Sequence, residues 1–252
     1  MGPQQGVRRV LRSFFMAVVV GLVGIGATFA EPARPPVPED EIVSRYIDAT
    51  HEQQNALRGG SMEVDIDARL PKRKMHGTLH ALRNISKLGR ITYHMLGFSG
   101  DNTVKTEVIA RYLSAEVQAN QGDNKGESNF SITPENYKFK YKGTQELDGR
   151  DAYVLRVTPR EKKVGLFKGE LWLDTETFMP VRESGSFVKT PSIFLKKVQF
   201  VRHYMLQNGV SVPQRTESKI EARFFGPVEL DINYQNFSKD ADADAAASSL
   251  NK

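Results

Sequence analysis

A strictly alternating stretch constrains the fold of this chain most. Residues 62–70 read MEVDIDARL, with apolar side chains at Met62, Val64, Ile66, Ala68 and Leu70 and charged side chains between them. Successive side chains of a β-strand point to opposite faces, whereas a helix would scatter these five around its axis. The stretch therefore predicts a strand that carries all of its apolar side chains on one face.

Similar segments recur through the rest of the chain. They are short, rich in β-branched and aromatic residues, and divided by turn dipeptides such as Asp148-Gly149 and Asn208-Gly209, which is typical of antiparallel hairpins. The last of them alternates strictly again, with Leu230, Ile232 and Tyr234 on one face. The further predicted strands lie in MHGTLHALR, GRITYHMLGF, NYKFKYKG, AYVLRVTP, GELWLDT, PVRESGSFV, KKVQFVRHYML, SVPQRTESKIEARFF and VELDINYQNF.

Two segments have helical spacing instead. Residues 39–58 carry acids in the first turn and end at Gly59-Gly60, and residues 103–119 repeat apolar side chains every three to four positions. About ten strands and two helices predict an α+β fold dominated by one antiparallel sheet. Because so wide a sheet must curl, close or be covered, we expect a large curved sheet, an incomplete β-barrel, covered by helices.

The N-terminus has the pattern of a secretory signal peptide. Residues 1–30 place Arg8, Arg9 and Arg12 before the apolar run FFMAVVVGLVGIGATFA, which ends in small residues. The pattern predicts export to the periplasm; an uncleaved inner-membrane anchor stays open, because about 17 apolar residues is near the minimum that spans a bilayer. We expect a proline-rich linker over 31–38, one domain over 39–237, and a disordered tail over 238–252.

The charge of the exported part excludes a generally basic, nucleic-acid-binding protein. The chain has 35 basic and 30 acidic residues, a formal charge of +5. Three of the basic residues and none of the acidic ones lie in 1–30, so removing that segment leaves 32 against 30, or +2. The chain also has no cysteine, which excludes disulfides, thiolate nucleophiles and cysteine metal sites.

The remaining signals for chemistry are weak. The chain contains no G-x-S-x-G motif and no phosphate-binding glycine loop. His76 and His80 are four residues apart, but in a strand that spacing is about 13 Å, so we interpret them as isolated surface histidines. Asp240, Asp242 and Asp244 resemble the start of a calcium loop that lacks its glycine and glutamate. We therefore expect no enzyme, no metal and no cofactor.

One loop combines apolar and cationic side chains. In PREKKVGLFKGELWL (159–173), Leu166 and Phe167 lie among Lys162, Lys163 and Lys168 between two predicted strands. Apolar side chains at an exposed hairpin tip are unfavourable unless they contact something, and each cation near an anionic lipid surface contributes about 1 kcal/mol. The loop predicts transient contact with a membrane surface; the alternative is that Leu166 and Phe167 fold back onto the sheet as core.

The second half of the chain resembles a known superfamily. The segments LDGRDAYVLRVTP (147–159) and KGELWLDTETFMPVRESG (168–185), followed by FLKKVQFVRHY and FFGPVELDINYQNF, are similar to the outer-membrane lipoprotein-sorting superfamily, the LolA/LolB-like fold, over residues 40–237. The segment KTPSIFLKKV (189–198) departs from its pattern. The resemblance implies an incomplete antiparallel barrel whose concave apolar face holds acyl chains. Hiding a sixteen-carbon chain from water is worth on the order of 10 kcal/mol.

The resemblance implies a periplasmic carrier of lipid or lipidated protein, served by an envelope transporter. The candidates for its cavity, for each of which plain core is the alternative, are Met62, Val64, Ile66, Leu70, Ile91, Tyr93, Met95, Leu171, Leu173, Leu230, Ile232 and Tyr234. A second hypothesis is an envelope sensor or interaction module, in which the same fold recognises a partner protein. A hydrolase on the same sheet is a third.

Overall fold

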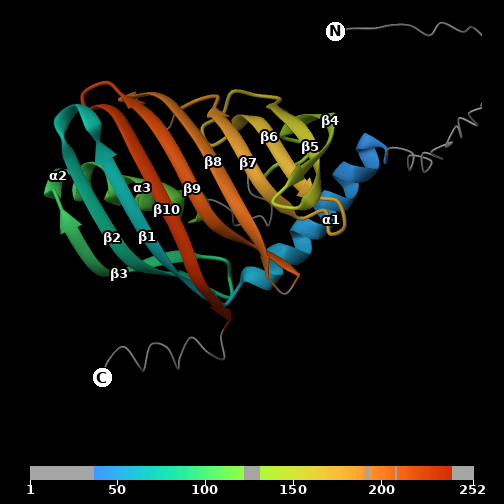
Figure 1. The fold of residues 1–252 in the computed structure, drawn as a ribbon, viewed down its shortest axis with the longest axis horizontal. Coiled ribbons are helices and arrows are strands. Elements are labelled where there is room, and N and C mark those ends of the chain that lie inside the picture. The colour runs from blue at the N-terminus through green and yellow to red at the C-terminus, as the bar shows by residue number, and fades with distance from the viewer. Residues whose placement is uncertain (1–36, 122–130, 191–192, 208, 240–252) are drawn as a thin grey trace, which may run out of the picture. The chain divides into compact units, whose positions relative to one another are not determined.

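The computed structural model describes residues 37–121, 131–190, 193–207 and 209–239 (Figure 1). Contacts divide the chain between Pro36 and Val37, and the fold below is that of the unit beginning at Val37. The predicted signal peptide and nearly all of the predicted linker lie outside the described residues. Within the described part, no helix is both long and apolar enough to cross a membrane.

One ten-stranded antiparallel sheet dominates this unit. Its strand order is β3-β2-β1-β10-β9-β8-β7-β6-β5-β4, so β3 and β4 form its two open edges, and Figure 1 shows it curved around its helices. The predicted incomplete barrel is thereby confirmed. The strands are β1 (Gly60–Leu70), β2 (Met75–Ile85), β3 (Ile91–Gly100), β4 (Tyr137–Leu147), β5 (Arg150–Pro159), β6 (Phe167–Asp174), β7 (Pro180–Phe187), β8 (Leu195–Gln207), β9 (Val210–Ala222) and β10 (Gly226–Lys239).

The two predicted helices are also present, on the concave side of the sheet (Figure 1). Helix α1 (Glu39–Leu57) contacts β4 and β9, and a second helical segment contacts β1, β2 and β3. That segment begins as α2 (Asn102–Val104), widens into a π-helical turn, η2 (Lys105–Ile109), and continues as α3 (Ala110–Gln121). A 3-10 turn, η1 (Pro71–Arg73), joins β1 to β2.

The concave face is packed into two apolar clusters. The first lies between β1, β2, β10 and the second helical segment, and the second lies between α1 and β4–β8. Alternation explains the first, because Ile66 and Ile232 are opposite each other in the β1–β10 pair and share the inward face. The fully buried side chains of the two clusters include Met62, Val64, Ile66, Leu70, Ile109, Ile232, Ile42, Tyr137, Leu155, Leu166, Leu171 and Leu173.

The segment LWLDTETFMP, which carries much of the superfamily resemblance, forms the β6–β7 turn. The buried carboxylate of Asp174 accepts hydrogen bonds from the backbone N–H of Thr177 (2.8 Å), its hydroxyl (2.8 Å) and the N–H of Glu176 (3.2 Å). A short acidic side chain that bonds to its own following backbone stabilises a tight turn. The turn brings Phe178 back into the second cluster.

The hairpin and tail predictions can be compared with the strand bounds. Asp148 and Gly149 join β4 to β5 with positive φ values of 52° and 79°, as a two-residue type I′ hairpin requires. Strand β10 runs further than predicted, because Ser238 pairs with Ser61 and Lys239 with Gly60. The predicted tail is therefore wrong at its first two residues, and 240–252 lie outside the described residues.

Candidate functional site

Charged and aromatic side chains line the concave face between the two apolar clusters. On the β2–β3 side, the guanidinium of Arg83 donates to Glu116 of α3 at 3.0 and 3.2 Å and to the Tyr93 hydroxyl at 3.2 Å. The Tyr93 hydroxyl in turn donates to Glu116 at 2.8 Å. Arg83 is buried, and its guanidinium forms hydrogen bonds of ordinary length with both Glu116 and Tyr93.

A second arginine on the same face is held more loosely. Arg202 of β8 lies 3.5 Å from the buried Glu183 of β7, and it reaches the Tyr204 hydroxyl at 3.4 Å and the Thr216 hydroxyl at 3.3 Å. All three distances exceed the usual 2.7–3.2 Å of a hydrogen bond from nitrogen to oxygen. The Arg202 side chain is 37% exposed. We call Glu183, Arg202, Tyr204 and Thr216 the Arg202 site.

Tyrosines connect the two arginines. Tyr112 of α3 hydrogen-bonds Tyr234 of β10, and both interact electrostatically with Arg202. Burial, and then the neighbouring carboxylates of Glu116 and Glu183, raise the pKa of Tyr93 and Tyr204 respectively. The pKa of Arg202 is raised first by Tyr204 and then, against the opposing effect of burial, by Glu183. At neutral pH the tyrosines are therefore uncharged donors beside two charged arginines.

Most of the predicted cavity residues lie in the apolar clusters rather than around a hollow. Met62, Val64, Ile66, Leu70, Ile91, Leu230 and Ile232 belong to the first cluster, and Leu171 and Leu173 to the second. Tyr93 and Tyr234 are partly buried and belong to the tyrosines beside Arg83 and Arg202 described above. Met95, on the edge strand β3, is 50% exposed and lies in neither cluster.

The predicted membrane-contact loop is corrected in part. Leu166 and Phe167 are buried, and the Phe167 ring packs against Tyr137 (5.9 Å between centroids) and Phe200 (5.0 Å). The alternative that these two residues are core is therefore the one the structure supports. Lys162, Lys163 and Lys168 are exposed, and Lys163 pairs with Glu161 at 2.9 Å.

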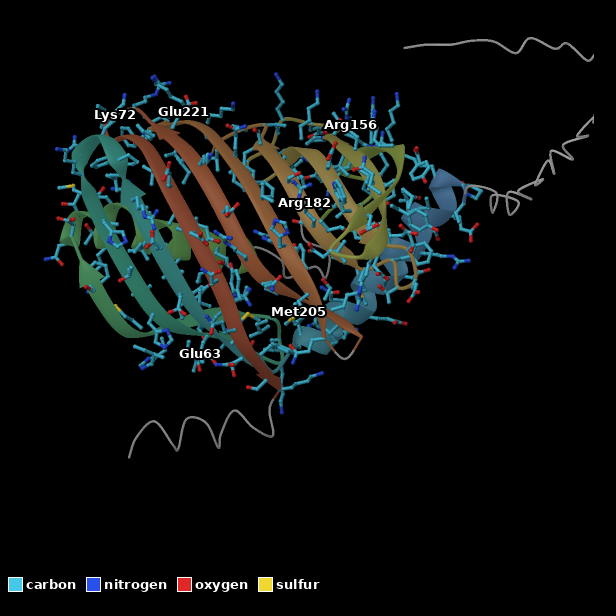
Figure 2. All side chains as sticks on the ribbon, in the orientation of Figure 1. Glu63, Lys72, Arg156, Arg182, Met205 and Glu221 are labelled. Carbon is cyan, nitrogen blue, oxygen red and sulfur yellow. The ribbon has the colours of Figure 1, made fainter. Side chains whose placement is uncertain are left out.

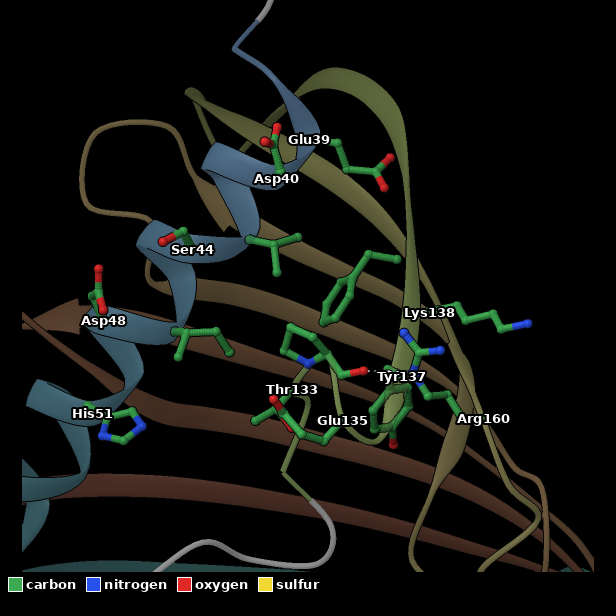
Figure 3. Close-up of a pocket in the computed structure, with 14 residues that line it drawn as sticks. Glu39, Asp40, Ser44, Asp48, His51, Thr133, Glu135, Tyr137, Lys138 and Arg160 are labelled. Atoms are coloured by element: carbon green, nitrogen blue, oxygen red, sulfur yellow. Dashed lines mark hydrogen bonds between the residues drawn. The ribbon is translucent and has the colours of Figure 1, made fainter.

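Two hollows of the described residues lie elsewhere. A groove of about 610 Å³ lies between α1 and residues 133–139 (Figure 3), and its lining includes Val43, Phe139 and the α1 carboxylates of Asp40 and Asp48. Its Arg160 is already bonded to the Pro134 carbonyl at 2.7 Å. The second hollow, about 390 Å³, lies over β1–β3 and includes Ile66 of the cavity candidates.

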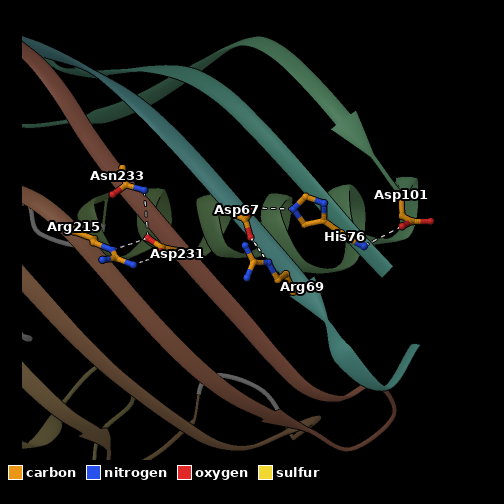
Figure 4. A network of polar contacts seen from close by, with 7 residues as sticks. All are labelled: Asp67, Arg69, His76, Asp101, Arg215, Asp231 and Asn233. Atoms are coloured by element: carbon orange, nitrogen blue, oxygen red, sulfur yellow. Dashed lines mark hydrogen bonds and ion pairs between the residues drawn. The ribbon is translucent and has the colours of Figure 1, made fainter. Parts of the chain in front are cut away.

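The convex face carries a network of exposed charges (Figure 4). Asp67 pairs with Arg69 (2.9 Å) and with His76 (2.7 Å), and Arg215 pairs with Asp231. The two histidines lie at the surface and pair with different carboxylates, since His80 pairs with Asp65 at 2.8 Å. No group of three or more potential metal ligands occurs among the described residues. Such exposed pairs contribute little to stability and form a solvated surface.

The Arg202 site has the chemistry of a binding site. A guanidinium with weakly used donors, flanked by the hydroxyls of Tyr204 and Thr216, can donate hydrogen bonds to carbonyl or carboxylate oxygens of a ligand. The alternation of inward and outward side chains along the strands could have revealed this site from the sequence. In VQFVRHY, Arg202 and Tyr204 continue the inward phase of Val198 and Phe200, and Arg83 likewise continues the inward phase of Leu79 and Ala81.

A sequence model of the MucB/RseB N-terminal domain family matches residues 101–215, a range that contains Tyr112, Glu116 and three of the four residues of the Arg202 site. The resemblance to the lipoprotein-sorting superfamily is confirmed. No curated protein sequence matches the chain.

Several solved structures are similar at low identity. A DUF1329 family protein from Desulfovibrio piger is 14% identical, covering 79% of this chain and 93% of that one with a TM-score of 0.41. A LolA superfamily protein from Nitrosomonas europaea is 14% identical, covering 81% and 94% with a TM-score of 0.38. The Pseudomonas aeruginosa MucA/MucB complex contains a chain 13% identical, covering 75% and 93% with a TM-score of 0.27.

Proposed function

We propose that this protein is an exported, non-catalytic binding module that holds a segment of a partner polypeptide on its concave face, against the Arg202 site. The observation that carries the proposal is the state of Arg202: its side chain is 37% exposed, and the neighbours of its charged guanidinium lie only at 3.3–3.5 Å. A buried or half-buried arginine is usually well satisfied, as Arg83 is, so the spare donors of Arg202 suit an external acceptor.

A polypeptide suits this surface better than a small anion. The two arginines are balanced by Glu116 and Glu183, so the face has no net charge to attract a free phosphate or sulfate. Peptide carbonyls accept hydrogen bonds at short range, and the long contacts of Arg202 leave its guanidinium able to donate them. Tyrosine and arginine are also the residue types that contribute most to binding energy in protein interfaces.

The carriage of acyl chains remains a prediction. Residues expected to surround such chains are packed against one another, with Leu70, Leu171, Leu173 and Ile232 fully buried. Sheltering a hydrocarbon chain against them would require the two clusters to separate. A lipidated partner would combine the two ligands, with its peptide part at the Arg202 site and its acyl chain in the interior. A native mass spectrum of the purified protein distinguishes bound lipid from bound polypeptide.

Replacing Arg202 by alanine is expected to reduce recovery of the partner at least tenfold. The measurement is affinity capture from envelope extract with the tagged protein, followed by quantitative mass spectrometry. Arg215→Ala is the matched control, because Arg215 lies on the neighbouring strand β9 but on the convex face, where it pairs with Asp231 and Glu217. It should recover the partner as the unmodified protein does.

Folding must be separated from binding in this experiment, since Arg202 also neutralises the buried Glu183. Arg202→Lys keeps that charge but lacks the planar fork of the guanidinium, and it should lose partner binding while keeping the melting temperature. If both Arg202 variants recover the same proteins as the control, the Arg202 site is not the binding site.

A further inference from the structure

One end of the sheet exposes a group of large apolar side chains. The β7–β8 loop presents Ile193 (79% exposed) and Phe194 (44%), and the β9–β10 turn presents Phe224 (66%). The rings of Phe194 and Phe224 lie 5.4 Å apart, so the three side chains form one continuous projection from two loops. We call Ile193, Phe194 and Phe224 the apolar tip. Lys72 and Glu221, labelled in Figure 2, mark this end of the sheet.

The backbone carbonyl groups of the apolar tip all accept hydrogen bonds. Arg223 donates through its side chain to the Ile193 carbonyl (2.8 Å) and through its N–H to the Phe194 carbonyl (2.8 Å). The side chain of Arg73 donates to the Phe224 carbonyl at 3.1 Å and stacks on Phe225 at 4.9 Å. All three tip residues thus present apolar side chains while their carbonyl oxygens are satisfied from below. That combination is what an apolar environment requires of a polypeptide backbone.

Cations surround the apolar tip. They come from η1 and the residue after it, from the β7–β8 loop and the start of β8, and from the β9–β10 turn. Within the described residues none of them forms an ion pair with a carboxylate, and the one exposed acid on β9 beside them is Glu221, which faces Lys197 in the β8–β9 pair. The exposed cations are Lys72, Arg73, Lys74, Lys189, Lys196, Lys197 and Arg223.

We infer that this end of the sheet docks the protein on the surface of an anionic phospholipid bilayer. The apolar tip would enter the boundary between headgroups and acyl chains, and the unpaired cations around it would face the lipid phosphates. A protein partner would match the apolar tip equally well. The ring of exposed lysines, which are mobile point charges, instead fits a fluid array of phosphates. Membrane contact was predicted for the 159–173 loop, and the inference assigns it to a different part of the chain, including the segment that departs from the superfamily pattern.

The inference is tested with vesicles of phosphatidylcholine, alone or with 30% phosphatidylglycerol, by co-sedimentation of the full chain. We expect binding to the anionic vesicles and at least tenfold weaker binding to the neutral ones. Ile193→Ser combined with Phe224→Ser should weaken anionic binding at least tenfold. Leu88→Ser is the matched control, because Leu88 is also 79% exposed but lies in the β2–β3 turn, at the other end of the sheet. It should bind as the unmodified protein does.

The charges are tested separately. Lys196→Glu with Lys197→Glu should abolish the difference between anionic and neutral vesicles, whereas Lys140→Glu on the edge strand β4 should reduce binding less than twofold. Equal melting temperatures exclude misfolding as the cause. If the serine variant binds anionic vesicles normally, the contact is electrostatic only and the inference is overturned. It is also overturned if the unmodified protein binds neither vesicle. Arg202→Ala should bind vesicles normally, so this test is independent of the proposed function.

Discussion

Replacing Leu171 by alanine is expected to lower the free energy of unfolding by about 3 kcal/mol, measured by urea denaturation. Leu171 is fully buried in the second cluster, opposite Leu155 in the β5–β6 pair. Removing three carbon atoms there leaves a cavity that the flanking strands cannot close. The loss of stability is expected to be large because this part of the concave face is closely packed core.

The control for that prediction is Met95→Ala. Met95 was expected to share the interior but is half-exposed on edge strand β3, so its truncation should change the free energy of unfolding by less than about 0.5 kcal/mol. If Leu171→Ala costs as little as Met95→Ala, Leu171 faces an empty interior. That outcome would favour the carrier of acyl chains over the packed core described above.

Replacing Arg83 by alanine is expected to destabilise the protein by a similar amount, about 3 kcal/mol. Arg83 is buried, and without it the carboxylate of Glu116 and the hydroxyl of Tyr93 lose their shared donor. Removing one partner of a buried ion pair is costly, whereas replacing both partners by apolar residues is not. Chemical denaturation should therefore show that Arg83→Met with Glu116→Leu recovers most of the loss.

Arg69→Ala provides the comparison for Arg83→Ala. Arg69 pairs with Asp67 on the convex face, where both side chains are solvated, so the change should be small. If Arg83→Ala is no more destabilising than Arg69→Ala, the Arg83–Glu116 pair does not hold α3 to the sheet.

The fold could be predicted largely from the sequence because its pattern is local. Alternation in MEVDIDARL and VELDINYQNF assigns every second side chain to the covered face, and β1 and β10 are paired with those residues facing each other. Helical spacing located α1 to within a residue. The order of the ten strands follows from hairpins between chain neighbours, except for the β1–β10 pair, which joins the two halves of the sequence.

The candidate site was harder to predict from the sequence than the fold. Polar residues such as Arg83, Glu183 and Arg202 lie on the inward phase of their strands, but which of them pair depends on strand register and on helix packing that no local pattern gives. Arg83 and Glu116, for example, meet only after β2 and α3 have packed. The loop prediction failed for a related reason: Leu166 and Phe167 are covered by Tyr137 and Phe200, which no local pattern connects to them.

The exposure of the apolar tip could not be predicted from local sequence either. Ile193 and Phe194 are ordinary loop residues by sequence, and their exposure beside Phe224 becomes visible only when β7–β8 and β9–β10 meet at one end of the sheet. Tertiary packing decides which of two similar loops, each with apolar residues among lysines, is core and which is surface.

Site-specific photo-crosslinking tests the proposed binding role most directly. A photoreactive phenylalanine analogue in place of Tyr204 should cross-link the protein to a partner polypeptide in envelope extract, and the same group in place of His203, whose side chain points to the convex face, should not. Cross-linking from position 203 but not from 204, or from neither position in extract where the partner is captured, would contradict binding at the Arg202 site.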